Sequence, residues 1–340
     1  MLGRSLWRIK RRAKRALPPA FGFVLILLAG AFPVRADMLK WAPPPLVDPV
    51  TVTVEPGDFM TRQPTDRDCI LRWPVARHLG FVMIEGCHNL VSMGGWNSIP
   101  QGPDRSNKAL ARILYLKGLT GTAHIEGLLG DSSAGGMSDC IDIWAPEATV
   151  QIENVRCDGL IGFNDQFHAD CIQPFGGVKA LRVYNFTCRT GYQGLSVWPV
   201  ELSPLGWSVD LERVNVISTG RQIWGRGNNG GYLYWPCGER HCANVAATTL
   251  REVYLQPRPE KDFASTVYSV RTHAVDWPPA LSEAGDEIRF PGLPIKGVVR
   301  RGPPPEGDFV PVGRAGPGYA TPGYQVEPLQ DLHAVKAGKG

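Results

Sequence analysis

The chain has 340 residues, of which 43% are hydrophobic and 20% are charged, and its formal net charge is +4. Residues 1–36 hold eight Lys and Arg but no Asp or Glu, so the remaining 304 residues have a net charge of −4. That acidic remainder lacks the basic character of a nucleic-acid-binding domain, and we expect no nucleic-acid partner. It is long enough to bury one large core.

The first 36 residues have the pattern of an export signal. Lys and Arg crowd the segment Arg4–Arg15, an apolar run follows at Phe21–Ala31, and Val34-Arg35-Ala36 forms a small-residue cleavage site. We predict a secretory signal peptide cut after Ala36, and hence a bacterial periplasmic or secreted protein without stable membrane insertion after cleavage. The alternative is an uncleaved anchor, although the apolar run is short for a bilayer.

The remaining chain is predicted to be all-β. No segment has a convincing helical period, and short β-rich runs are separated by Gly, Asn and Asp. Residues 37–77 are interpreted as an N-terminal lead-in that caps the first coil, 78–256 as the main β-region, and 257–340 as a Pro-rich C-terminal cap and tail. The predicted strands are Phe81–Glu85, Arg112–Lys117, Ala123–Glu126, Ile141–Trp144, Thr149–Asn154, Ala180–Phe186, Ser208–Val216 and Thr249–Leu255.

An internal repeat with an offset of 31 residues decides the predicted fold. Asp139-Cys140-Ile141 returns as Asp170-Cys171-Ile172, and Cys157 returns as Cys188. Such a repeat predicts a solenoid in which like residues stack in columns. One column consists of asparagines that follow an apolar strand and hydrogen-bond to each other along the stack. Its predicted members are Asn154, Asn185 and Asn215.

These Asn positions, together with Ile84-Glu85-Gly86 and Ile125-Glu126-Gly127, resemble the right-handed parallel β-helix proteins of the pectate-lyase-like superfamily. The resemblance covers roughly residues 78–256 and implies an all-β, right-handed parallel β-helix. A leucine-rich repeat is the competing solenoid, because it also places Asn after an apolar strand, but its period is usually shorter.

All eight cysteines follow the predicted cleavage site, and an even number in an exported chain favours disulfides. The pairs Cys237–Cys242 and Cys69–Cys87 are close in sequence and are predicted to be bonded. For the other four cysteines, the repeat permits bridges between neighbouring coils, because coils about 4.8 Å apart lie within the reach of a disulfide. These bridges would be Cys140–Cys171 and Cys157–Cys188, and the alternative is a ladder of buried free thiols.

The strongest polar cluster in the sequence is His168-Ala169-Asp170-Cys171-Ile172-Gln173. In an extended chain His168 and Asp170 project to one side, and a carboxylate beside an imidazole suits acid–base catalysis. Stacking places Asp139 beside Asp170, and carboxylates so close would share protons or bind a cation such as Ca²⁺. Because Ile172 belongs in the core, Asp170 is predicted to lie in the turn before the strand or at a bulge in the strand. The alternative is a structural polar ladder at a turn.

Further residues near these coils are predicted to bind substrate. Stacking places Asp142 beside Gln173, and the side chains of Lys179, Arg189 and Gln193 are suited to an acidic sugar. Aromatic rings stack on sugar faces at low entropic cost. They crowd one Gly-rich stretch, where the alternative is packing of loops against the coil wall, and they are Trp198, Trp207, Trp224, Tyr232, Tyr234 and Trp235.

Asp-Cys-Ile is similar to a segment of polygalacturonases, β-helix glycoside hydrolases whose catalytic acids lie there, and the likeness makes Asp139 and Asp170 the candidates. The Asp doublet and the Gly-His-Gly of that family are missing. We predict a monomeric, exported polysaccharide-binding protein that is a lyase or a glycoside hydrolase. In a hydrolase Asp139 and Asp170 form the acid–base pair, and in a lyase His168 or a neighbouring Arg or Lys abstracts the proton. The alternative is a non-catalytic adhesin or scaffold.

Overall fold

The structure, a computed structural model, describes residues 38–101, 111–163, 167–198, 200–220, 230–237, 242–267 and 285–325. The chain divides into two units, Met1–Ala36 and Asp37–Gly340, and every described residue belongs to the second. The predicted signal peptide therefore lies outside the described residues. In the part described, no helix is long and apolar enough to cross a membrane.

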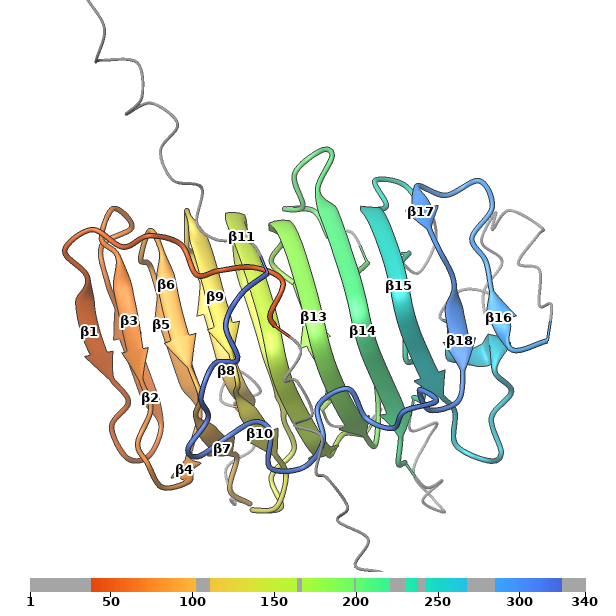
Figure 1. The fold of residues 1–340 in the computed structure, drawn as a ribbon, viewed down its shortest axis with the longest axis horizontal. Coiled ribbons are helices and arrows are strands. Elements are labelled where there is room, and N and C mark those ends of the chain that lie inside the picture. Colours follow the sequence, from red (N-terminus) through yellow and green to blue (C-terminus); the bar gives the residue numbers. More distant parts are fainter. Residues whose placement is uncertain are drawn as a thin grey trace, which may run out of the picture. The chain divides into compact units, whose positions relative to one another are not determined.

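The second unit is built almost entirely of parallel strands, as predicted, and its described residues contain no helix beyond the short 3₁₀ turn η2 (Ala264–Thr266). One row of strands, the first row, is seen face-on in Figure 1. It comprises β1 (Val50–Thr53), β3 (Cys69–Arg72), β6 (Leu90–Met93), β9 (Thr122–Glu126), the later part of β11 (Asp139–Leu160), β13 (Val178–Thr190), β14 (Ser208–Ser218), β15 (Ala247–Gln256), β17 (Ile295–Lys296) and β18 (Val299–Arg301).

Two further rows complete the coils. The second row comprises β2 (Phe59–Arg62), β5 (Val82–Glu85), β8 (Arg112–Lys117), the early part of β11 and β12 (Ile172–Gln173). The third row comprises β4 (His78–Leu79), β7 (Trp96–Ser98), β10 (Leu129–Asp131) and the end of β11. The short β16 (Glu287–Ile288) pairs antiparallel with β18. Strand β11 thus passes from one row to another within a single coil.

Each coil lies on the previous one in register, but the coils differ in length. Gln151 lies beside His124, which precedes it by 27 residues. The step from Asn154 to Asn185 takes 31 residues, and the step from Asn185 to Arg213 takes 28 residues. The offset of 31 therefore describes one step of the stack, because loops of different length leave each coil. Parallel pairing also begins at β1, within the predicted lead-in, and extends to β18. The arrangement is consistent with a β-solenoid.

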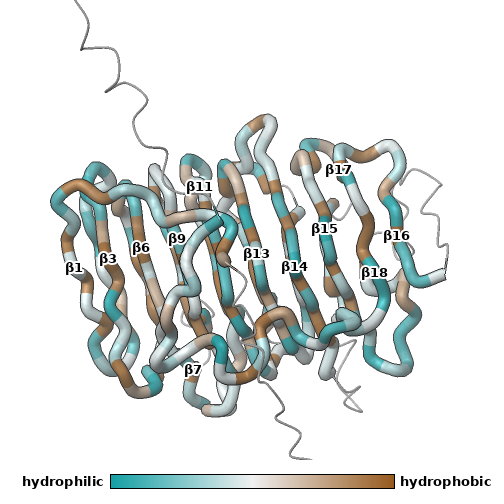
Figure 2. Tube along the Cα trace, in the orientation of Figure 1, coloured by the Kyte–Doolittle hydropathy of each residue, from teal (hydrophilic) through white to brown (hydrophobic). Residues whose placement is uncertain are grey.

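The core consists of aliphatic side chains stacked along the coil interior. Ile152 lies between Ile125 and Val183 in the register, and the same column continues through Leu211 to Leu250. All five side chains are buried, and each contributes about 1.5–3 kcal/mol through the hydrophobic effect. Along β13, β14 and β15 polar and apolar residues alternate, as Figure 2 shows, because successive side chains face inward and outward.

A column of left-handed residues bends the chain just after β6 and β9 and within β11, β13, β14 and β15. Asn185 Nδ2 donates to Asn154 Oδ1 at 3.2 Å, which confirms this part of the predicted ladder. The prediction for Asn215 is wrong: the step of 28 residues brings Arg213 next to Asn185, and Asn215 instead accepts a hydrogen bond from the Thr187 hydroxyl. The members of the column, all with φ between 49° and 69°, are Gly94, Gly127, Asn154, Asn185, Arg213 and Glu252.

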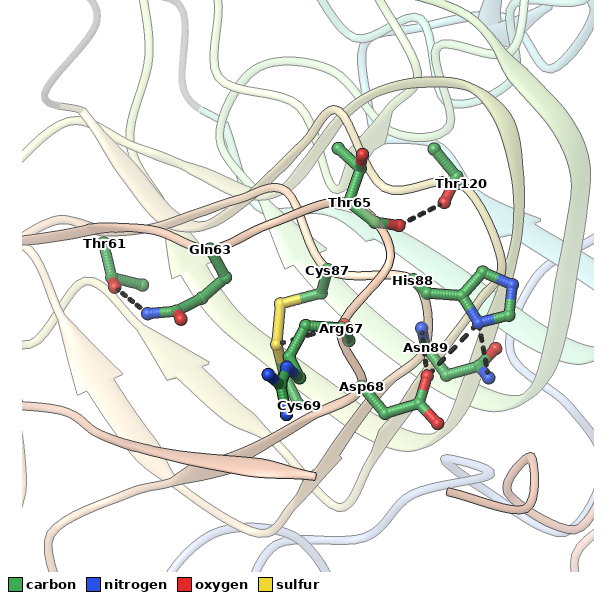
Figure 3. Close-up of a disulfide and its surroundings, with 10 residues drawn as sticks. All are labelled: Thr61, Gln63, Thr65, Arg67, Asp68, Cys69, Cys87, His88, Asn89 and Thr120. Atoms are coloured by element: carbon green, nitrogen blue, oxygen red, sulfur yellow. Dashed lines mark hydrogen bonds and ion pairs between the residues drawn. A yellow bond between two sulfur atoms is a disulfide. The ribbon is translucent and has the colours of Figure 1, made fainter. Parts of the chain in front are cut away.

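Four disulfides bridge all eight cysteines. The predicted Cys69–Cys87 bridge, drawn in Figure 3, and the predicted Cys237–Cys242 bridge are both present. The other four cysteines form Cys140–Cys157 and Cys171–Cys188, with Cα atoms 6.2 Å apart in each pair.

Both predictions for these four cysteines, bridges between coils and free thiols, are therefore wrong. Cys157 does lie beside Cys188 on the next coil. Each cysteine nevertheless bonds to the cysteine 17 residues away in its own coil. The chain between the two cysteines turns around the coil, so that the second cysteine faces the first across the coil. Four disulfides indicate an oxidising, extracellular or periplasmic compartment.

The two ends of the described chain meet on the outer face of the first row. In Figure 1 the segments before β1 and after β18 cross over these strands. Leu39 N–H donates to Gly323 O at 2.7 Å, and Gln325 N–H donates to Leu39 O at 2.6 Å. Glu153, which is fully buried, accepts the Lys40 N–H at 2.8 Å.

The neighbouring buried carboxylate, Glu126, holds the C-terminal segment. It accepts hydrogen bonds from the Tyr319 and Tyr324 hydroxyls at 2.7 and 2.8 Å, and His124 Nε2 lies 2.9 Å from it. Burial raises the pKa of Glu126, but the bonds from His124 and the two tyrosines outweigh it and lower the pKa below its ordinary value. Two acidic side chains on adjacent coils therefore anchor the two terminal segments.

The disulfide pairing can be tested by mapping peptides of the unreduced protein. We expect peptides that link Cys140 to Cys157 and Cys171 to Cys188. Replacing Cys171 and Cys188 by Ala should lower the free energy of unfolding by about 3 kcal/mol, because the denatured chain loses a closed loop. Replacing Cys237 and Cys242, which close a much shorter loop, should cost less. Peptides that join Cys140 to Cys171 would contradict the pairing.

The contact at Glu153 makes stability depend on pH. Burial raises the pKa of Glu153 from 4.5 to about 7, against the lowering effects of His124 and the Lys40 and Trp41 N–H groups. A raised carboxyl pKa gives stability that is fully present below the unfolded value and is lost as the pH rises through 7. Glu153→Gln should therefore gain stability relative to wild type between about pH 5 and pH 8.5, by up to about 3 kcal/mol.

Thermal unfolding across this pH range measures the effect. Glu306→Gln, at an exposed carboxyl, is the matched control and should follow wild type. A constant difference between Glu153→Gln and wild type at every pH would show that Glu153 does not titrate in this range.

Candidate functional site

The outer face of the second row carries the candidate site. Ile141 and Ile143 point into the core, so Asp142 between them points to the opposite side. Asp142 lies between Tyr115 and Gln173 in the register, as predicted for Gln173. Asp170 precedes β12, also as predicted.

Three aspartates meet on this face and form what we call the carboxyl cluster: Asp139, Asp142 and Asp170. Their exposed fractions are 2%, 0% and 0%. The Asp170 N–H donates to Asp139 Oδ1 at 2.7 Å, which places the predicted pair on adjacent coils in contact.

A single guanidinium is bonded to the carboxyl cluster among the described residues. Arg112, which lies beside Asp139 in the register, donates through Nε to Asp142 Oδ2, and its Nε is 4.0 Å from Asp139 Oδ2. Within the described part of the chain, Asp142 Oδ1 and both carboxyl oxygens of Asp170 have no hydrogen-bond partner. Buried polar oxygens without partners are uncommon, and they favour a site that binds water, a proton or a ligand.

Burial and mutual repulsion raise the pKa values of the three aspartates in the cluster. Burial, followed by the charges of Asp142 and Asp170, raises the pKa of Asp139 well above its ordinary value. Burial and then the charge of Asp142 do the same to the pKa of Asp170. Burial also raises the pKa of Asp142, but the Arg112 guanidinium limits it to about 6. The aspartates of the cluster therefore hold their protons more tightly than ordinary aspartates do.

Aromatic rings border the cluster on the Arg112 side. The guanidinium carbon lies 4.8 Å from the Tyr115 ring centroid and 5.0 Å from that of Phe175. Phe175 in turn contacts Trp144, with ring centroids 5.6 Å apart. Trp144 is 39% exposed, so this group offers an apolar ring face to solvent.

A second aromatic group borders Asp170. The exposed His168 ring stacks on buried Tyr192 with centroids 5.2 Å apart. Burial, then the nearby charges of Asp170 and Tyr232, raises the pKa of Tyr192, which places its phenol near both residues. Tyr232 contacts Trp235, and Trp235 stacks on Trp198 at 5.9 Å. The carboxyl cluster thus lies next to partly exposed rings on two sides.

The structure separates several residues that the sequence suggested for one site. Lys179 is exposed on β13, and Arg189, also on β13, binds Asp308 of the C-terminal segment at 2.9 Å. Gln193 is buried, and its N–H donates to Ala169 O at 3.0 Å. Among the aromatic residues, Trp207 and Tyr234 belong to the core, while Trp224 lies outside the described residues.

Sequence reasoning missed Arg112 as a site residue, although the strand Arg112–Lys117 was predicted with its observed bounds. Arg112 lies one coil before Asp139, on the same step of 27 residues that separates His124 from Gln151. The sequence feature that could have identified Arg112 is therefore a second repeat offset, of 27 residues. This offset is not apparent in the sequence, because only the 31-residue step preserves residue types. The missed ring of Tyr115 follows from the same register, which places Tyr115 beside Asp142.

The described residues do not support the expected calcium site. They contain no group of three or more His, Cys, Asp or Glu side chains arranged to hold a metal ion. Arg112 occupies one oxygen of Asp142, and the Asp170 N–H occupies one oxygen of Asp139. We therefore derive no chemical step through Ca²⁺.

Comparison of the chain with protein-family models, curated proteins and solved structures finds no match. The interpretation of the site consequently depends on its own geometry and chemistry.

The different partners of Asp170 and Asp142 predict opposite effects of the same substitution. Ionised Asp170 has no cation bonded to it, so its raised pKa gives stability that is lost as the pH rises. Asp170→Asn should therefore gain stability relative to wild type as the pH rises above about 4, the ordinary pKa of an aspartate. Asp142→Asn leaves Arg112 without its partner and should lose about 3 kcal/mol near neutral pH.

Thermal and urea unfolding measure both effects, with exposed Asp66→Asn as the matched control. Equal losses for Asp170→Asn and Asp142→Asn at every pH would contradict the assignment of Arg112 to Asp142.

Proposed function

We propose that this protein is an exported bacterial glycoside hydrolase that binds a polysaccharide on the outer face of the second row. We further propose that its coils form a right-handed parallel β-helix of the pectate-lyase-like superfamily. The parallel rows, the in-register core and the column of left-handed residues along the first row support that fold. The fold favours carbohydrate chemistry by analogy only, so the function is argued from the site.

The observation that carries the proposal is the hydrogen bond from the Asp170 N–H to the Asp139 carboxyl, which joins two buried aspartates whose pKa values lie well above the ordinary value. Glycoside hydrolysis needs a carboxylic acid that is protonated at the working pH and a second, ionised carboxylate near it. Two carboxyls that repel each other in a buried site provide this combination, because ionising one makes ionising the other harder.

The proposed reaction uses one water molecule. Asp170, which has no cation bonded to it, donates its proton to the glycosidic oxygen as the bond from that oxygen to the anomeric carbon breaks. Asp139 accepts a proton from water, whose oxygen bonds to the anomeric carbon. The products are a new reducing end and a free hydroxyl on the leaving sugar. Proton exchange with solvent then restores the starting state of both aspartates.

Hydrolysis agrees with the site better than β-elimination does. A lyase removes a proton beside a uronate carboxylate and needs a free cation to neutralise that carboxylate. Arg112 is already bonded to Asp142, and Arg189 is bonded to Asp308. Carboxyls with raised pKa values suit the acid that protonates a leaving oxygen.

Burial sets a requirement on this mechanism. Asp139 and Asp170 are almost completely covered, so a sugar reaches them only when neighbouring side chains shift. Partly exposed Trp144, Trp198 and Trp235 offer ring faces on which a sugar can stack before that shift.

The same burial favours a second candidate, a non-catalytic adhesin or scaffold. In that case the carboxyl cluster would serve only to hold adjacent coils together, and the aromatic rings would bind a glycan without cleaving it.

Incubation of the protein, without residues 1–36, with a panel of neutral and acidic polysaccharides tests the proposal. We expect new reducing ends without unsaturated sugars. Asp139→Asn and Asp170→Asn should each lower the rate at least about 100-fold while remaining folded, and Asp66→Asn should retain full activity. Unsaturated products would show a lyase. Glycan binding with no cleavage of any polysaccharide would favour the adhesin.

A further inference from the structure

Arg112 interacts to a different extent with each of the three aspartates. The strand register places it beside Asp139, but its Nε donates to Asp142, and Asp139 is 4.0 Å from the same atom. Asp170 is bonded to no cation among the described residues. The three carboxyls therefore differ in their interaction with one guanidinium: Asp142 is bonded to it, Asp139 lies near it, and Asp170 is not bonded to it.

The position of the guanidinium is fixed by more than its charge. Its carbon lies against the rings of Tyr115 and Phe175, whose own centroids are 5.7 Å apart. Arginine binds aromatic faces and carboxylates through one planar group, which lysine does not have. The rings thus orient Arg112 toward Asp142 and limit its movement toward Asp139 or Asp170.

The other ionisable groups near the cluster do not replace this cation. Glu85 of β5 and Tyr115 of β8 lie on the side of Arg112, and Tyr115 has a pKa raised by burial to about 12. Tyr192 lies near Asp170, and its ring stacks against that of His168. On the elements that contact the cluster, Arg112 is the cation whose bonds to the aspartates the structure shows.

We propose that Arg112 is the positioning residue of the proposed active site: it holds Asp142 as an anion and so leaves Asp139 and Asp170 as the pair that exchanges the catalytic proton. This inference rests on the proposed function. The effect of Arg112 on the titration of Asp142 can nevertheless be measured without any substrate. Fixed Asp142 also keeps a negative charge beside the pair, which holds one proton on it and prevents both members from ionising together.

The direct test is a carbon-13 NMR titration of the aspartate carboxyls, with Asp142 assigned through Asp142→Asn. In wild type Asp142 should titrate near pH 6. In Arg112→Met its midpoint should rise by about one to three units, because an opposite charge has been removed. Arg62→Met, which removes an exposed second-row arginine paired with Glu85, is the matched control and should leave the midpoint unchanged.

Activity gives the second readout. In Arg112→Met the acidic limb of the pH–rate profile should move to higher pH, because the guanidinium, 4.0 Å from Asp139, lowers the pKa of Asp139. Arg112→Lys keeps the charge but not the planar contact, and should restore the limb while kcat stays reduced and KM changes little. Circular dichroism establishes that each variant is folded, and Arg112→Lys also serves if Arg112→Met does not fold.

The outcomes separate the two proposals. An Asp142 midpoint that moves by less than about half a unit in Arg112→Met would overturn the role of Arg112, even if the protein is a hydrolase. Absence of cleavage together with a shifted midpoint would overturn the proposed function alone. A pH profile unchanged in an active, folded Arg112→Met would also overturn the role of Arg112.

Discussion

Hydrogen bonding between successive coils is the constraint on which the rest of the structure depends. Parallel strands lie about 4.8 Å apart, so each residue acquires a neighbour on the next coil that is distant in the chain. The same register stacks Ile152 on Val183 in the core, Asn154 on Asn185 at a turn, and Asp142 on Gln173 outside. A shift by one residue would exchange the inner and outer faces.

The coil interior and the coil exterior use this stacking differently. Inside, like side chains in contact are favourable, because aliphatic columns exclude water. Outside, stacking brings carboxylates together: Glu126 beside Glu153 on the first row, and the three aspartates on the second. The first pair is satisfied by backbone N–H groups and tyrosine hydroxyls of the two terminal segments. The aspartates have one guanidinium and oxygens left without partners, which is why the second row is the candidate site.

The sequence was sufficient to predict the strands β5, β8, β9, β11, β13, β14 and β15, but not β1 to β3 of the predicted lead-in. It also predicted one step of the stack, because that step preserved Asp-Cys-Ile, Asn and Cys together. It did not predict the two shorter steps on either side, whose stacked residues share hydropathy but not identity. Arg112 was therefore missed and Asn215 was wrongly placed in the ladder. Two of the four disulfides were mispaired for a related reason: a linear repeat shows which cysteines are vertical neighbours, but not which ones face each other across a coil. Burial of the aspartates depends on loops and rings that no local pattern specifies.

A high-resolution crystal structure near neutral pH tests the central claim, that in-register coils bring Asp139 and Asp170 together while Arg112 binds Asp142. The account predicts a hydrogen bond of 2.7 Å from the Asp170 N–H to an Asp139 carboxyl oxygen, with the guanidinium on Asp142. A structure in which Asp139 and Asp170 lie on separate faces of the coils, or in which Asp170 is bonded to Arg112, would contradict it.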